Sequence, residues 1–107
     1  KTDSQFGPVV LIGMGGVGVE IYQDSSIRMA PLRENDVKSM VSQLKAWQLI
    51  EGFRGSEAVN MKKLSELVVR FSELAVELEK EFESIDLNPV ICTGDRCVIA
   101  DARIILK

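Results

Sequence analysis

The feature that most constrains the fold is an alternation of apolar and polar residues in the last quarter of the chain. It runs through Ile85–Cys92 and resumes in Cys97–Arg103. A period of two residues is typical of half-buried β-strands. The segment between the two runs, Thr93–Arg96, has the composition of a tight turn. The sequence therefore predicts an antiparallel β-hairpin with one half-buried face.

The turn also predicts a register for this hairpin. If the hairpin is centred on Gly94-Asp95, Asn88 lies directly opposite Asp101. Directly opposed side chains share a face, with Cβ atoms roughly 4.5–5.5 Å apart. An amide oxygen and a carboxylate would then converge at one spot. Because Mg²⁺ is usually held by one or two such oxygen ligands together with water and phosphate, we expect a Mg²⁺ site at this pair.

A second interpretation is a solvent-exposed hairpin that carries no site. In the same register Asp86 faces Arg103, and this pair could be a surface ion pair that contributes about 0–1 kcal/mol. Asn88 and Asp101 could likewise lie on the solvent face of an edge hairpin. A slip of one residue would send all four side chains to the opposite face. The pattern alone leaves both interpretations open.

Composition and charge limit the class of protein. The chain has 107 residues, of which 46% are hydrophobic and 27% charged, as in a soluble globular domain. A net charge of −3 gives no general nucleic-acid-binding surface. No apolar run approaches the ~20 residues that span a bilayer, and no signal-peptide pattern is present. We expect residues 1–107 to form a single domain, cytoplasmic and not membrane-bound. Because the chain begins with Lys1 and not Met, we also expect it to be a fragment of a larger protein.

The cysteines and the absence of histidine bear on chemistry. Cys92 and Cys97 face each other in the same register, so a cross-strand disulfide is geometrically conceivable. For a cytosolic protein the expected state is two reduced cysteines. The sequence contains no histidine, the commonest general base and transition-metal ligand.

Two segments have helical periodicity. The spacing of apolar residues predicts a helix over Glu34–Lys45, with acidic residues near its positive end. A second helix is predicted over Met61–Lys80, with Asn60 as its N-cap. Its buried stripe is expected to consist of Leu64, Leu67, Val68, Phe71, Leu74, Ala75 and Leu78.

The order of these segments predicts the fold class. Short β-like runs at Val9–Ile12 and Val19–Tyr22 precede the helices, and the hairpin follows them. We expect these strands to share one mostly antiparallel sheet, with the helices packed on one of its faces. This is an α+β architecture.

A glycine-rich segment suggests a different fold. The spacing in Gly13–Gly18 matches the dinucleotide-binding fingerprint, but that match requires a helix to open at the third glycine. Val19–Tyr22 alternates like a strand, and Pro31 arrives before any helical period. The alternative is a flexible turn that lets the backbone approach a neighbour or ligand closely. Glu20 is then either a solvent-facing strand residue or a carboxylate directed toward an active-site cleft.

Six segments, in the same order and across nearly the whole chain, match a known pattern: Phe6–Val10, Gly15–Glu20, Arg28–Leu32, Glu51–Gly55, Asp86–Pro89 and Val98–Arg103. Together they resemble the C-terminal part of the ATP-grasp region in ADP-forming (NDP-forming) acyl-CoA synthetases. These enzymes are related to the succinyl-CoA synthetase β subunit. The most specific part of the resemblance is the combination of Asp-x-Asn-Pro with Ala-Asp-Ala-Arg.

The resemblance implies a ligase that interconverts acid, CoA and ATP with acyl-CoA, ADP and phosphate through acyl phosphate and phosphohistidine. It implies that Asn88 and Asp101 bind Mg²⁺ beside the phosphates of ATP or ADP, in agreement with the hairpin register. Asp86 is a candidate for the nucleotide site. Three further residues match family positions without an individual chemical role, as candidate catalytic residues: Glu20, Arg28 and Arg103. An arginine near phosphate would offer charge-assisted hydrogen bonds.

The resemblance also implies partners. ATP-grasp enzymes clamp the nucleotide between two subdomains, and the resemblance covers only one of them. The expected partners are the remainder of the ATP-grasp region and a CoA-binding domain or subunit that carries the phosphorylated histidine. The chain alone is expected to be inactive. A non-catalytic interaction or regulatory module that retains the fold is the alternative from another class.

Overall fold

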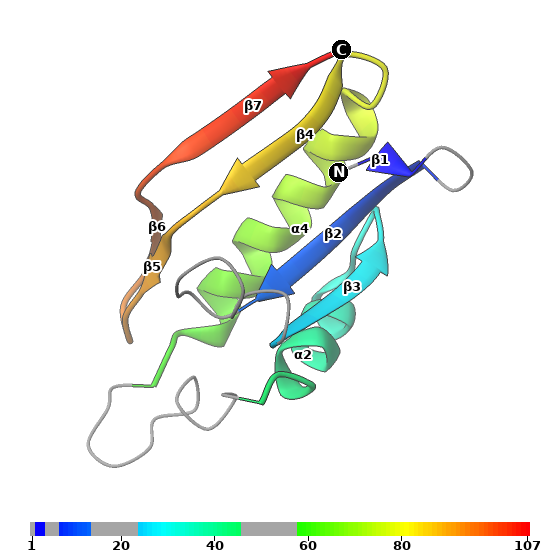
Figure 1. The fold of residues 1–107 in the computed structure, drawn as a ribbon. Coiled ribbons are helices and arrows are strands. Elements are labelled where there is room, and N and C mark those ends of the chain that lie inside the picture. The colour runs from blue at the N-terminus through cyan, green and yellow to red at the C-terminus, as the bar shows by residue number, and fades with distance from the viewer. Residues whose placement is uncertain (1, 4–6, 14–23, 46–57) are drawn as a thin grey trace.

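The structure is a computed structural model that describes residues 2–3, 7–13, 24–45 and 58–107. Its elements are β1 (Thr2–Asp3), β2 (Gly7–Gly13), β3 (Ser25–Met29), α2 (Glu34–Ser42), α4 (Met61–Glu77), β4 (Phe82–Leu87), β5 (Val90–Cys92), β6 (Cys97–Ile99) and β7 (Ala102–Leu106). All of the described strand pairs are antiparallel, and both helices lie on the same side of the strands (Figure 1). The α+β class with helices on one face is therefore confirmed. None of the described helices is long and apolar enough to cross a membrane.

The strands on either side of the glycine-rich segment are direct neighbours. β2 and β3 pair from Val9 opposite Met29 to Gly13 opposite Ser25. A dinucleotide-binding unit instead has parallel strands joined by a crossover helix. The dinucleotide-binding interpretation is therefore wrong. The predicted strand at Val19–Tyr22 lies outside the described residues.

The core lies between the β2–β3 ladder and the two helices. α2 begins at Glu34, as predicted, and ends at Ser42. Its apolar face is fully buried, with Val37 and Met40 at 0% exposure. From the sheet side, Val10 reaches the same cluster. Burial of such aliphatic side chains is the main favourable term that holds the two layers together.

α4 has two apolar sides, and the predicted stripe does not distinguish them. Its most buried residues are mostly small: Ser65, Val68, Ser72 and Ala75. Its larger side chains, among them Leu67, Phe71 and Leu74, line a groove beneath the C-terminal hairpin together with its C-cap residue Leu78. The prediction is wrong for Leu74, which is 44% exposed. The two buried serines were missed because helical periodicity was counted on apolar residues only.

The C-terminal hairpin has the predicted register. β4 pairs with β7 through Asp86 opposite Arg103, and β5 pairs with β6 through Cys92 opposite Cys97. Pro89 lies between the two ladders. Because proline has no N–H to donate, it interrupts the hydrogen-bond pattern without shifting the register.

Asn60 connects the hairpin to α4. It is the N-cap of α4, as predicted, and its Oδ1 accepts a hydrogen bond from the Lys63 N–H at 3.0 Å. The Asn60 backbone N–H donates to the Thr93 carbonyl oxygen at 2.9 Å, and its Nδ2 donates to the Gly94 carbonyl oxygen at 3.1 Å. One side chain thus caps the helix and holds the tip of the hairpin.

The expectation of one shared sheet is not met by the described residues. β1, β2 and β3 form one ladder system, whereas β4–β7 and β5–β6 form the separate hairpin. β1 contacts β4 as well as β2, but it is only two residues long. So short a strand cannot bridge the full length of its neighbours.

The expectation of reduced cysteines is also wrong for this structure, in which Cys92 and Cys97 form a disulfide. Their Cα atoms are 4.1 Å apart, near the spacing of about 4.5 Å for a non-hydrogen-bonded antiparallel pair. The predicted register brought the two side chains together, and the argument from cellular compartment did not anticipate the bond.

The two fully buried serines of α4 should respond oppositely to alanine. Ser72 Oγ accepts from the Leu32 N–H at 2.9 Å and donates to the Val69 carbonyl oxygen at 2.7 Å. Ser72→Ala leaves a buried N–H without its partner and should lower the free energy of unfolding by about 1–3 kcal/mol. Ser65 Oγ has no hydrogen-bond partner among the described residues, so Ser65→Ala should be neutral or slightly stabilising. Urea denaturation of both variants checks this, and equal losses would contradict it.

Asn60 substitutions should separate the helix cap from the hairpin contact. Asn60→Ala removes both and should cost about 1–2 kcal/mol. Asn60→Asp keeps an oxygen for the Lys63 N–H but has no donor for the Gly94 carbonyl, so it should retain most of the stability and still loosen the hairpin tip. Urea denaturation measures the first effect. Amide hydrogen exchange at Thr93, whose N–H donates to the Arg96 carbonyl oxygen at 2.8 Å, measures the second, and unchanged exchange in Asn60→Asp would contradict it.

Candidate metal site

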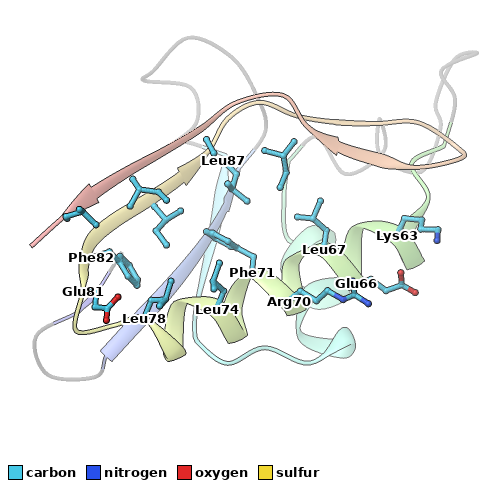
Figure 2. A pocket seen from close by; sticks show the side chains of 15 residues that line it. Lys63, Glu66, Leu67, Arg70, Phe71, Leu74, Leu78, Glu81, Phe82 and Leu87 are labelled. Carbon is cyan, nitrogen blue, oxygen red and sulfur yellow. The ribbon is translucent and has the colours of Figure 1, made fainter.

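The hairpin has an apolar inner face, and its outer face carries polar residues beside exposed apolar ones such as Ile105. On the inner face, Ile85, Leu87 and Ile104 line an open groove of about 660 Å³ against α4 (Figure 2). Because successive side chains of a strand point to opposite faces, Asp86 and Arg103 belong to the outer face, away from α4. Both are exposed. The alternation in the sequence therefore corresponds to a real division of the hairpin.

Asn88 and Asp101 lie directly opposite each other and are exposed. The Asn88 N–H donates to the Asp101 carbonyl oxygen at 3.1 Å, which fixes this pairing in the backbone. Asp101 Oδ1 accepts from the Ala102 N–H at 3.0 Å, so the carboxylate is oriented by the start of β7. The predicted juxtaposition of an amide and a carboxylate is confirmed at the level of register.

The chemistry of this pair fits Mg²⁺. Amide and carboxylate oxygens are hard ligands, and Mg²⁺ is commonly held by one or two protein groups while water and phosphate oxygens complete its shell. The described residues contain no cluster of three or more His, Cys, Asp or Glu side chains that could hold a metal. The Asn88–Asp101 pair could therefore hold Mg²⁺ only together with such additional oxygen ligands. Its exposure leaves room for them.

Asp86 and Arg103 form the neighbouring pair along the hairpin. They are opposed in the register, two residues from Asn88 and Asp101 respectively. The outer face therefore presents an amide, two carboxylates and a guanidinium in two adjacent rows. This mixture of charges suits a cation bound beside an anionic group such as phosphate.

The structure does not bring Arg28 together with this pair. Arg28 is half-buried on β3 opposite Val10, on the side of the ladder that faces the helices. Its Nη2 donates to Gln43 Oε1 at 2.9 Å and its Nη1 to the Ile27 carbonyl oxygen at 2.9 Å. The bond to Gln43 attaches β3 to the end of α2, a contact that the sequence did not reveal. Glu20 lies outside the described residues.

Comparison with known proteins places the chain in a family. A family model described as an ATP-grasp domain matches residues 1–106. The chain is 42% identical over 104 residues to acetate–CoA ligase [ADP-forming] I subunit beta of Pyrococcus furiosus, covering 97% of this chain and 44% of that protein. It is 37% identical over 106 residues to 4-hydroxybutyrate–CoA ligase [ADP-forming] of Nitrosopumilus maritimus, covering 97% of this chain and 15% of that protein.

A solved structure is similar as well. It is dinucleotide forming acetyl-coenzyme A synthetase 1 of Ca. Korarchaeum cryptofilum, in complex with coenzyme A and Mg-AMPPCP, with a TM-score of 0.90 and 45% identity. The match covers 98% of this chain and 49% of that one. The chain thus spans just under half of the Pyrococcus subunit and of the Korarchaeum chain. The expected resemblance is confirmed: the chain belongs to the ATP-grasp domain family, and it is similar to part of ADP-forming CoA ligases and synthetases.

Proposed function

We propose that this chain is the nucleotide- and Mg²⁺-binding portion of an ADP-forming acyl-CoA synthetase. Such an enzyme converts an acid, CoA and ATP into acyl-CoA, ADP and phosphate. The observation that carries the proposal is the Asn88–Asp101 pair, opposed on the outer face of a hairpin in a chain related to ADP-forming CoA ligases. The Korarchaeum relative was solved with Mg-AMPPCP, a nucleotide with its metal.

In this proposal Asn88 and Asp101 hold Mg²⁺, which when bound neutralises phosphate charge during phosphoryl transfer. Asp101 contributes an anionic oxygen and Asn88 a neutral one. The hydrogen bond from the Ala102 N–H keeps the carboxylate oriented before the ligand arrives. The protein's part in this step is positioning, because the register of the hairpin sets the spacing of the two ligands.

Arg103 acts on the phosphates from the neighbouring row, which also carries Asp86. The guanidinium of Arg103 donates charge-assisted hydrogen bonds to a phosphate oxygen, and Asp86 lies opposite it in the register. Arg28 does not belong to this row, because it lies on β3. It holds β3 against α2 through Gln43.

The remaining functions belong to a larger parent enzyme. The chain supplies one side of the nucleotide clamp, and the remainder of the ATP-grasp region supplies the other. A CoA-binding domain or subunit supplies the phosphorylated histidine, since this chain has none. The Korarchaeum relative was solved with its phosphohistidine segment pointing towards the nucleotide-binding site. We place the parent enzyme in the cytoplasm.

The isolated chain should bind Mg²⁺-ATP weakly or not at all. Tight nucleotide binding depends on an enclosing, largely pre-formed site, whereas Asn88 and Asp101 are exposed on an open face. Calorimetric titration of the isolated chain and of the parent enzyme under the same conditions checks this. Micromolar affinity in the isolated chain would show that the second side of the clamp is not needed.

Substitution of the pair in the parent enzyme should affect turnover and leave the fold intact. Asp101→Asn keeps the shape and the acceptor for the Ala102 N–H but removes a negative charge from the cation site. Turnover should fall by several orders of magnitude, because the metal acts in the chemical step. Asn88→Ala should cost less, since water can partly replace a neutral ligand.

Asp95→Asn is the matched control. Asp95 is an exposed aspartate in the turn of the same hairpin, so its substitution makes the same change of charge away from the pair. Steady-state rates across a Mg²⁺ titration, together with urea denaturation, separate the outcomes. Normal turnover of Asp101→Asn at low Mg²⁺ would mean that the pair is a surface feature and would favour a non-catalytic module.

A further inference from the structure

We infer that Cys92 and Cys97 form a reversible dithiol–disulfide couple, and that its oxidised form locks the hairpin that carries Asn88 and Asp101. The redox partner of this couple is a small thiol–disulfide pair of the glutathione class. The chemistry of the couple and its effect on the hairpin stand on the structure of the hairpin alone. The effect on turnover rests on the proposed function, because it passes through the Mg²⁺ site.

The register keeps the two cysteines together in either redox state. The Thr93 N–H donates to the Arg96 carbonyl oxygen at 2.8 Å. The next pair along this ladder, Cys92 with Cys97, is therefore a non-hydrogen-bonded pair, the kind in which opposed side chains are closest. The two Cα atoms are 4.1 Å apart. Because the backbone sets this proximity, reduction leaves the thiols side by side and the bond can form again.

The bond acts locally and does not hold the whole fold together. The stabilisation from a disulfide increases with the length of the loop that it closes, and these cysteines are separated by only five positions. The core lies elsewhere, between β2, β3 and the helices, where Val37 and Met40 are fully buried. Reduction should therefore leave the fold intact and change only the hairpin.

The β5–β6 end of the hairpin has little else to hold it closed. Its ladder consists of three residue pairs, and the middle pair, Ile91 with Val98, is exposed. Pro89 interrupts the hydrogen-bond pattern between this ladder and that of β4 and β7. Asn60 holds the tip through two hydrogen bonds. In the described part of the hairpin, the disulfide is the single covalent link between the strands, so its loss leaves a short, exposed ladder.

The surroundings of the cysteines favour a small redox partner. Both cysteines are half-buried, and partly exposed disulfides are the labile, regulatory kind. Ile99 lines the groove against α4, and Cys97, two residues earlier on β6, shares its face. The pair thus lies on the side of the hairpin that faces α4, where a small thiol fits better than the active site of a redox protein. In the cytoplasm, where we place the parent enzyme, protein disulfides are mostly transient and redox-sensing.

Oxidation of the couple takes two thiol–disulfide exchanges. The thiolate of one cysteine attacks the disulfide of the oxidant, forms a mixed disulfide and releases one small thiol. The opposed cysteine then attacks the protein sulfur of the mixed disulfide, forms the Cys92–Cys97 bond and releases the second small thiol. Two protein thiols thus lose two electrons and two protons, and the oxidant gains them as two thiols. Reduction by two small thiols is the reverse reaction.

The ladder transmits this change to the candidate metal pair. Asn88 and Asp101 each lie four residues from a cysteine of the couple. Between the two pairs, the Ala100 N–H donates to the Pro89 carbonyl oxygen at 3.0 Å. When the binding-competent register is occupied only about a third of the time, the apparent affinity for a ligand of that register falls roughly threefold. The oxidised form is therefore the form with the higher affinity for Mg²⁺.

Peptide mapping of the parent enzyme tests the chemistry. Arg96 lies between the two cysteines, so trypsin releases residues 81–96 and 97–103 as separate peptides that stay joined only through the disulfide. The enzyme is equilibrated with mixtures of reduced and oxidised glutathione, and free thiols are alkylated before digestion. The joined fraction should rise and fall reversibly without urea. A bond that is reduced only in urea, a bond that never forms, or a glutathione mixed disulfide as the final product would overturn the inference.

Hydrogen exchange in the parent enzyme tests the lock. Reduction should accelerate exchange of the Thr93, Ala100 and Asn88 amides at least roughly threefold. The Leu32 amide, which is bonded to Ser72 Oγ in the core, is the reference and should not change. Faster exchange at Thr93 alone would mean that opening stops at the tip, and this would overturn the link to the metal pair.

Serine variants separate this couple from other thiols of the parent enzyme. In the wild type, the Mg²⁺ concentration for half-maximal turnover should be about threefold higher after reduction, with little change at saturating Mg²⁺. Cys92→Ser combined with Cys97→Ser should match the reduced wild type in both glutathione mixtures, in turnover and in exchange at Asn88. Cys97→Ser alone keeps one thiol but cannot close the bond, so it should match the double variant. A redox response in the double variant equal to that of the wild type would overturn the inference.

The failure of this inference is distinguishable from failure of the Mg²⁺ proposal. Peptide mapping and hydrogen exchange involve neither nucleotide nor metal. A redox response in exchange at Asn88 supports the couple even if Asp101→Asn turns over normally. Absence of that response overturns the couple and leaves the Mg²⁺ proposal intact.

Discussion

The hydrogen bond from the Asn88 N–H to the Asp101 carbonyl oxygen, 3.1 Å long, holds the register on which both faces of the hairpin depend. It lies beside Pro89, where the ladder loses a donor and the two strands could most easily slip. A slip by one residue would turn the apolar row of Ile85 and Leu87 toward solvent and bury charged residues against α4. The apolar lining of the groove and the candidate metal site therefore depend on the same register.

The position of that hairpin depends in turn on Asn60. Its side chain satisfies the Lys63 N–H at the start of α4 and the Gly94 carbonyl oxygen at the hairpin tip. A capping residue normally stabilises only its own helix. Here it also couples the helix that supports the core to the turn that closes the hairpin. Because the tip is held in this way, the outer face keeps a fixed orientation relative to the helical layer.

The sequence predicted those features that local rules determine. The cap at Asn60 follows from the N-cap preference of asparagine before a helical apolar stripe, and the register of Asn88 with Asp101 follows from turn composition and period-two alternation; both are observed. The buried serines could not be predicted in this way, because Ser72 is defined by its bond to Leu32, forty residues away in sequence. The predicted register placed Cys92 opposite Cys97, but the argument from a cytosolic location predicted free thiols, whereas the structure has a disulfide. The prediction of a single sheet was wrong for the described strands, because β1 is only two residues long and pairs with only two residues of β2.

Exposure of the Asn88–Asp101 pair and the short pairing of β1 have a common consequence. A cation held by two oxygens on an open face still needs most of its ligands from elsewhere, and a strand edge without a neighbour still needs its hydrogen bonds completed. Both deficits concern the sheet rather than the helical layer, where the core is fully packed around Val37 and Met40. The core between β2, β3 and the two helices is thus closed, whereas the groove between α4 and the hairpin is open. In the clamp proposed above this asymmetry is useful, because stability resides in the helical core while the hairpin remains available for ligand and partner.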